Sequence, residues 1–163
     1  MTVRFLGLAA LVAAISGCGS AVAEKVEAGN QAPSFSLTAQ DGSVVDTASL
    51  KGRVVLLNFW STTCGPCIRE MPHLQAVDDA GLAKVVGVAV DPGGWDAVRP
   101  FLAKHKVRFT VAIGTEELFL RFDGFSLPHS LLLDKDQRVV KVYRGAVTKE
   151  KLEKDIAAIN TRG

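Results

Sequence analysis

A buried strand that runs into a helix carrying two closely spaced cysteines is the feature that most restricts the fold of this chain. Residues 53–60 read Arg-Val-Val-Leu-Leu-Asn-Phe-Trp, a nearly continuous apolar run that is typical of a strand covered on both faces. Shortly after it comes Cys64-Gly65-Pro66-Cys67, and apolar residues then recur at helical spacing. Pro66 suits the first turn of a helix, where its missing N–H group costs nothing. We therefore predict a central strand, a short turn and a helix that begins at the cysteine pair.

The position of Cys64 at a helix N-terminus predicts a reactive thiol. Unpaired backbone N–H groups and the positive end of the helix dipole stabilise a thiolate, so the pKa of Cys64 should fall below that of a free thiol. Cys67 lies one turn further into the helix, where it can attack a mixed disulfide formed by Cys64 and leave the pair oxidised. This order makes Cys64 the predicted nucleophile and Cys67 the resolving thiol.

A zinc site and a purely structural disulfide are the two other uses of such a pair. Zinc normally takes four ligands, but the chain has no second paired-cysteine motif, and His73, His105 and His129 are widely scattered. A structural disulfide across so short a loop would remove little entropy from the unfolded chain, so it would stabilise little. Dithiol redox chemistry without a metal or a cofactor is therefore the favoured interpretation.

Composition and charge are those of one compact exported domain. The chain has 163 residues, of which 48% are hydrophobic and 22% charged, which is enough for one core and too little for two ordinary domains. The net charge is +2 and no basic block is present, so we expect no nucleic-acid partner.

Residues 1–23 have the pattern of an export signal, with an apolar stretch too short for a comfortable membrane span. Cleavage before Cys18 would give a lipidated cysteine, whereas cleavage after Ala23 would give a protein without an anchor. The first is favoured because it explains the odd third cysteine. Either way, a linker at 24–30 and a folded domain at 31–163 are expected in the periplasm or on the outer face of the cell membrane.

Strand and helix patterns alternate along the rest of the chain. A hairpin is expected around Asp41-Gly42. Further strands are predicted at 84–90, 109–113, 131–133 and 138–144, and further helices at 95–105, at 116–122 and from Thr148. This order of elements predicts an α/β fold with a mixed sheet.

Several motifs together resemble the TlpA/ResA-type group of bacterial envelope thiol–disulfide oxidoreductases. The matching segments are Ala-Pro-Ser-Phe-Ser-Leu at 32–37, Leu-Lys-Gly at 50–52, Asn-Phe-Trp at 58–60, the cysteine motif, Glu-Met-Pro at 70–72, and Leu127-Pro128. The resemblance implies a thioredoxin fold, with a central mixed sheet flanked by helices, an N-terminal β-hairpin and a central αβ insertion. It also implies a cis peptide before Pro128, which would lie against the cysteine pair and present the backbone of Leu127 to a bound substrate.

The same resemblance gives a role to Glu70, which lies three residues after Cys67. Ordinary thioredoxins have a buried aspartate six residues before the first cysteine, but this chain has Asn58 there, which cannot take a proton. The group has a partly buried glutamate at the position of Glu70, where burial would raise its pKa and let it handle a proton of Cys67. The alternative is an ordinary solvated charge on the helix surface.

Two positions depart from the pattern of the group. Thr63 stands where an aromatic residue usually precedes the first cysteine, which should thin the cover over the sulfur and shift the redox potential. His129 follows the expected cis proline, where threonine is common. A histidine cation there would stabilise a thiolate, but a surface histidine is the favoured interpretation, and His73 and His105 are also predicted to be exposed.

Three functions fit these residues. The favoured one is a monomeric envelope reductant that acts on disulfide-bearing proteins, receives electrons from a membrane thiol-transfer protein, and prepares cysteines for haem or copper attachment. A thiol peroxidase is disfavoured because Leu57 stands where peroxiredoxins have a proline, although Ser61 fits their pattern. A copper- or haem-handling chaperone would use the thiols as ligands, but two methionines and three histidines do not make the expected ligand-rich surface.

Overall fold

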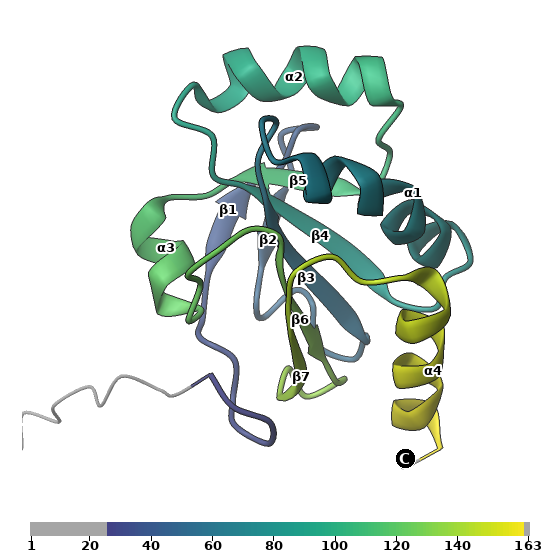
Figure 1. Cartoon of the computed structure of the whole chain (residues 1–163). Coiled ribbons are helices and arrows are strands. Elements are labelled where there is room, and N and C mark those ends of the chain that lie inside the picture. Colours follow the sequence, from purple (N-terminus) through teal and green to yellow (C-terminus); the bar gives the residue numbers. More distant parts are fainter. Residues whose placement is uncertain (1–25, 162–163) are drawn as a thin grey trace, which may run out of the picture.

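A five-stranded sheet forms the centre of the molecule (Figure 1). Its strands are β3 (Val55–Trp60), β4 (Lys84–Ala89), β5 (Thr110–Ile113), β6 (His129–Leu133) and β7 (Val139–Arg144), in the spatial order β5-β4-β3-β6-β7. The strands β3, β4 and β5 are parallel, whereas β6 is antiparallel to β3 and β7 is antiparallel to β6. The computed structural model describes residues 26–161, so the predicted export signal and Cys18 lie outside the described residues.

Helices and an N-terminal hairpin cover the two faces of this sheet (Figure 1). The helices are α1 (Gly65–Asp79), α2 (Gly94–His105), α3 (Glu116–Arg121) and α4 (Lys149–Asn160), and the hairpin pairs β1 (Ser36–Thr38) with β2 (Val44–Asp46). Apolar residues of α1, α2 and α4 share one core with one face of the sheet. Those of α3 and the hairpin form a second core with the other face. The two cores explain why the central strands are apolar on both sides.

The strand β3 lies between the two cores, and every one of its side chains is buried. Leu56 and Trp60 belong to the core beneath α1, whereas Leu57 and Phe59 belong to the core beneath α3. Successive side chains of a strand point to opposite faces, so a strand covered on both faces needs an uninterrupted apolar run. Asn58 is the polar exception, and it faces α1.

The predicted fold class is confirmed. The expected elements are present, the sheet is mixed and flanked by helices, and the unit formed by α2 and β5 is inserted between β4 and the segment that leads to β6. The hairpin turns at Gly42, whose φ of 84° is accessible to glycine at little cost.

Residues 26–30, part of the predicted polar linker, are attached to the domain by one buried side chain and by backbone hydrogen bonds, although residues 27–30 are exposed. Val26 is buried, and the backbones of Gly29 and Asn30 pair with Val139 at the start of β7 through bonds of 2.8 and 2.9 Å. The strand register places this end of β7 beside the start of β3, so the chain enters the domain at the end of the sheet away from Cys64. None of the helices between residues 26 and 161 is long and apolar enough to cross a membrane.

Candidate active site

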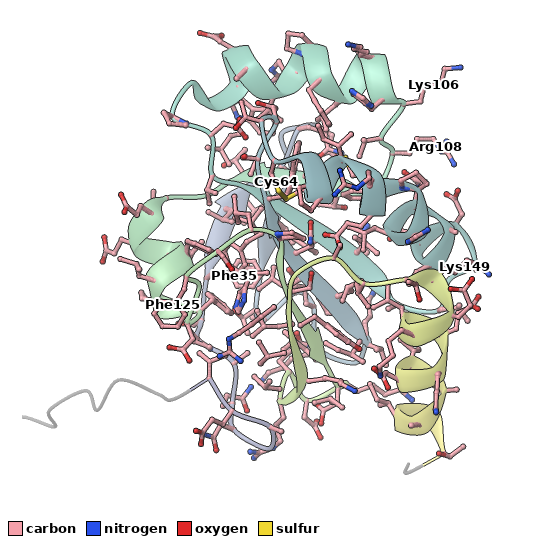
Figure 2. All side chains as sticks on the ribbon, viewed as in Figure 1. Phe35, Cys64, Lys106, Arg108, Phe125 and Lys149 are labelled. Carbon is pink, nitrogen blue, oxygen red and sulfur yellow. A yellow bond between two sulfur atoms is a disulfide. The ribbon has the colours of Figure 1, made fainter. Side chains whose placement is uncertain are left out.

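The two cysteines of the motif form a disulfide at the N-terminus of α1, with an S–S distance of 2.05 Å. Cys64 is the N-cap residue, and its sulfur accepts a hydrogen bond from the backbone N–H of Cys67 at 3.2 Å. Cys64 is partly exposed, whereas Cys67 is 1% exposed. The residue order is therefore the predicted one, with the partly exposed Cys64 before the buried Cys67. Figure 2 shows where Cys64 lies.

A cis peptide joins Leu127 to Pro128, as the resemblance implied. The strand β6 begins at the next residue, His129, which pairs with Phe59 of β3. Continuing this antiparallel register by one residue places Pro128 beside Trp60, at the point where the chain leaves β3 for the cysteine loop. Leu127 and Cys64 both pack against the core beneath α1. The proline loop and the cysteine loop therefore meet at the same edge of the sheet.

Glu70 is buried inside this edge, with 1% of its surface exposed. Its Oε1 accepts a hydrogen bond from the Asn58 side-chain amide at 2.9 Å, and its Oε2 accepts one from the backbone N–H of Val147 at 3.0 Å. Burial raises the pKa of Glu70 to about 7, while these two hydrogen bonds oppose the rise. The solvated alternative is excluded, and the buried carboxyl with a raised pKa that the resemblance implies is present.

Asn58 connects the carboxyl of Glu70 to the strand that follows the cis proline. Its Nδ2 donates to Glu70 Oε1 and also to Ser130 Oγ at 2.9 Å. Its Oδ1 is buried without a hydrogen-bond partner in the described part of the chain. A buried acceptor of this kind is costly unless some state of the site uses it.

Asp91 is a site residue that sequence reasoning missed. It follows β4 and is 8% exposed, and its carboxylate oxygens accept the backbone N–H of Thr62 at 3.0 and 3.1 Å. The Thr62 hydroxyl also donates to it. Asp91 thereby holds the cysteine loop two residues before Cys64. The available signal was its position directly after a predicted parallel strand, because such strand ends lie at the same edge as the end of β3.

The prediction of a surface histidine at position 129 was wrong. His129 is 1% exposed, its Nε2 donates to the Phe122 carbonyl at 2.8 Å, and its ring packs against Phe59 and Phe119. Ser130 faces α1, so its neighbour His129 must face the opposite side of the sheet, beneath α3. Burial lowers the pKa of His129, which favours the neutral ring. His129 therefore does not provide a cation beside the Cys64 thiolate either.

His73, His105 and Thr63 make ordinary packing and hydrogen-bond contacts. His73 is half-buried rather than exposed, with its Nδ1 at 3.3 Å from the Val147 carbonyl oxygen, because the segment before α4 covers it. His105 is exposed as predicted and stacks on Phe101. Thr63 is exposed, and its hydroxyl lies 3.3 Å from that of Ser61. Across residues 26–161, no three His, Cys, Asp or Glu side chains are grouped to hold a metal ion.

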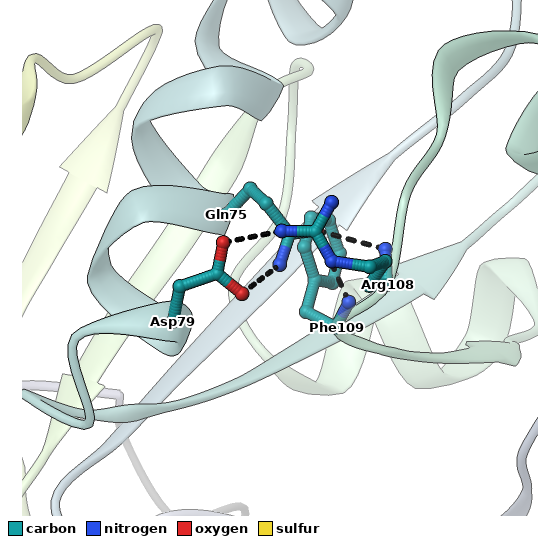
Figure 3. Close-up of polar contacts among 4 residues, drawn as sticks. All are labelled: Gln75, Asp79, Arg108 and Phe109. Carbon is teal, nitrogen blue, oxygen red and sulfur yellow. Dashed lines mark hydrogen bonds and ion pairs between the residues drawn. The ribbon is translucent and has the colours of Figure 1, made fainter.

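Polar contacts fix the position of α1 against the inserted unit (Figure 3). Gln75 accepts the backbone N–H groups of Arg108 and Phe109 at 2.8 and 3.3 Å, and the Arg108 guanidinium pairs with Asp79. Phe109 is completely buried, whereas the ion pair is exposed and contributes little by itself. The amide of Gln75 therefore links the helix that carries Cys67 to the start of β5.

The raised pKa of Glu70 predicts a pH dependence of stability. In the unfolded chain its carboxyl titrates near 4.5, so the folded state binds the proton more tightly between pH 4.5 and about 7. The free energy of unfolding should fall across this window by about 3 kcal/mol relative to the Glu70→Gln variant, which does not titrate. Urea unfolding of the oxidised proteins at several pH values would measure the difference. Parallel pH profiles for the two proteins would contradict it.

The negative charge of Asp91 should raise the pKa of Cys64. Its carboxylate accepts the backbone N–H of Thr62, and Thr62 lies two residues before Cys64, or about 7 Å along the chain. Asp91→Asn keeps an oxygen acceptor for Thr62 but removes this charge, so the pKa of Cys64 in the reduced protein should fall by about half a unit. Ultraviolet absorbance of the thiolate measures it. The control Thr62→Val removes the hydroxyl and keeps the charge, so a fall of equal size there would show that only loop geometry matters.

Comparison with known proteins places this site in a family. The Redoxin family model matches residues 27–159. Thiol-disulfide oxidoreductase ResA of Bacillus thuringiensis subsp. konkukian is 37% identical over 139 residues, covering 83% of this chain and 80% of the relative. ResA of Bacillus subtilis is 34% identical over 128 residues, covering 77% and 72%.

Solved structures show the same architecture. A putative thiol:disulfide interchange protein DsbE from Chlorobium tepidum superposes with a TM-score of 0.74 at 31% identity, covering 83% of this chain and 99% of that one. StoA from Bacillus subtilis gives a TM-score of 0.67 at 25% identity, covering 76% and 96%. With a cysteine pair at the N-terminus of α1 and a cis proline beside it, the chain belongs to the Redoxin family and is a thiol–disulfide oxidoreductase with the thioredoxin fold.

Proposed function

We propose that this protein reduces the disulfides of other proteins in the bacterial cell envelope. The observation that carries the proposal is the asymmetric cysteine pair, in which the partly exposed Cys64 caps a helix and Cys67 is buried beside it. Gly65 and Pro66 between the cysteines resemble the motif of reducing thioredoxins. The relatives named ResA support the same chemistry, and preparation of cysteines for haem or copper attachment is the task that fits it.

The reaction follows from the order of the cysteines. The Cys64 thiolate attacks one sulfur of the substrate disulfide, so a new S–S bond forms while the substrate S–S bond breaks, and the released sulfur takes a proton from solvent. Cys67 then loses its proton and attacks the sulfur of Cys64. This step closes the Cys64–Cys67 disulfide and breaks the mixed disulfide, and the second substrate sulfur leaves as a thiolate that takes a proton from solvent. Two electrons pass from the pair to the substrate, and a membrane thiol-transfer protein restores the dithiol.

We assign Glu70 as the group that accepts the proton of Cys67. Cys67 is almost inaccessible to water, and Glu70 lies one helical turn further along α1, with a pKa of about 7. As a carboxylate, Glu70 uses both oxygens to accept N–H groups. After taking a proton it needs an acceptor, and rotation of the Asn58 amide offers the unpartnered Oδ1 for this purpose. The Asn58 Oδ1 would thus accept a hydrogen bond from the protonated Glu70 carboxyl.

The proline loop is the second part of the proposed site. We assign the backbone of Leu127 to a substrate strand and the ring of Pro128 to the wall of the substrate groove. The cis peptide and the position of this loop at the end of β3 support the assignment. The proposed groove would lie next to the partly exposed Cys64, where a mixed disulfide would form.

The location in the cell is also part of the proposal. Lipidation of Cys18 after cleavage of the export signal would anchor the chain in the membrane, and the domain would act as a monomer. The described chain enters the domain at the end of the sheet away from Cys64. An anchor upstream of this entry would leave the cysteine pair on the side of the domain that faces away from the membrane.

The redox equilibrium of the purified domain tests the proposed direction of the reaction. A reductant should equilibrate with dithiothreitol at a potential near that of reducing thioredoxins, about −270 mV. A potential near about −120 mV would identify an oxidant instead. The variant Cys67→Ala should trap substrates as mixed disulfides on Cys64, whereas the control Cys64→Ala should trap none. A pair that does not cycle at all would contradict the proposal.

The role of Glu70 has its own kinetic test. In Glu70→Gln the second step should slow by at least about 100-fold, because proton transfer by a positioned group typically contributes this much. Formation of the mixed disulfide should keep its rate. Rapid-mixing measurements of product release would show the loss, together with the loss of an inflection near pH 7. The control Glu117→Gln changes an exposed glutamate on α3 and should behave as the parent protein does. Unchanged release in Glu70→Gln would remove Glu70 from the mechanism.

A further inference from the structure

One large aromatic side chain stands in solvent next to the proline loop. Phe125 is 76% exposed and is the most exposed large hydrophobic residue of the described chain, followed by Val44 and Leu120. It lies in the connection from α3 to β6, close to the end of α3 (Figure 2). Covering such a ring by an apolar partner would release about 1.5–3 kcal/mol, so a substrate segment bound along the neighbouring proline loop would gain from contacting it.

The backbone that carries Phe125 is fixed on its N-terminal side. The Phe122 carbonyl is held by the buried ring of His129, and Asp123 pairs with Arg144 of β7 at 3.5 Å. The backbone N–H of Gly124 donates to the Phe119 carbonyl at 3.0 Å. This hydrogen bond therefore holds Gly124, the residue before Phe125, against α3.

Only glycine fits at position 124. A Cβ atom there would lie 2.1 Å from the ring of Phe119, so the chain packs directly against that ring before it turns outward. On the other side, the Pro128 carbonyl accepts the backbone N–H of Gly145 at 2.9 Å. With both ends of the connection held, Phe125 is presented to solvent on a defined scaffold, which lowers the entropy lost when a partner binds.

The connection also leads directly into the proposed substrate groove. Phe125 precedes Pro128 by three residues, so the two Cα atoms are within about 11 Å of each other. An extended segment bound along Leu127 advances by about 3.3 Å per residue. A side chain within about three residues of the reactive cysteine can therefore reach the ring of Phe125.

We propose that Phe125 is an apolar anchor that selects, among disulfide-bearing substrates, extended segments with a large apolar side chain within about three residues of the attacked cysteine. The buried ring of His129 holds the Phe122 carbonyl, from which the connection to Phe125 starts. The inference rests on the proposed function and adds to it the class of substrate.

Two synthetic peptides test the selection. Each contains one internal disulfide, and they differ only by leucine or serine two residues from the attacked cysteine. The reduced protein should reduce the leucine peptide about tenfold faster, which corresponds to 1.4 kcal/mol. Phe125→Ser should lose this difference, whereas the matched control Leu120→Ser, which removes another exposed apolar side chain of the same region, should keep it. All three proteins should reduce oxidised glutathione equally and have the same redox potential.

The outcomes separate this inference from the proposed function. Equal rates for the two peptides with the parent protein, or an unchanged preference in Phe125→Ser, would overturn the anchor while leaving the reductase intact. Failure to reduce even oxidised glutathione would instead contradict the proposed function. Sedimentation provides the remaining check, because a dimer that dissociates in Phe125→Ser would show that a second copy of the chain covers this ring.

Discussion

The hydrogen-bonded pairing of β3 with β4 on one side and β6 on the other is the constraint on which the active site depends. The cysteine loop leaves the end of β3, Asp91 follows the end of β4, and Pro128 precedes the start of β6. Because β4 is parallel and β6 antiparallel to β3, these three points meet at one edge of the sheet. A shift of register by one residue would also turn Asn58 away from Glu70, because side chains alternate between the two faces.

The buried carboxyl of Glu70 gives this edge its chemical character. Burial of a carboxylate is costly, and two N–H donors offset only part of the cost, so the pKa stays near 7. The two donors come from β3 and from the segment before α4, and the acid itself from α1. The proton affinity of Glu70 is therefore a property of the tertiary packing.

The opposite face of the sheet holds His129, the neighbour of Ser130 in β6. His129 lies beneath α3 as a neutral ring, where it fixes the start of the connection that carries both Phe125 and the cis proline. One strand thus places Ser130 beside Asn58 on one face and His129 against the Phe122 carbonyl on the other. The two residues face opposite sides because successive side chains alternate along a strand, and this strand is buried on both sides.

The order of elements, the strand-to-helix junction and the asymmetry of Cys64 and Cys67 can be predicted from local patterns, because apolar periodicity and helix capping act over neighbouring residues. The burial of Glu70 and the cis peptide at Pro128 followed only from resemblance, since neither has a local cause. Tertiary structure alone decided the surroundings of Asp91 and His129. Their partners, Thr62 and Phe122, are identified by strand pairing and by the face a side chain takes, and both of these depend on contacts between segments that are distant in the chain.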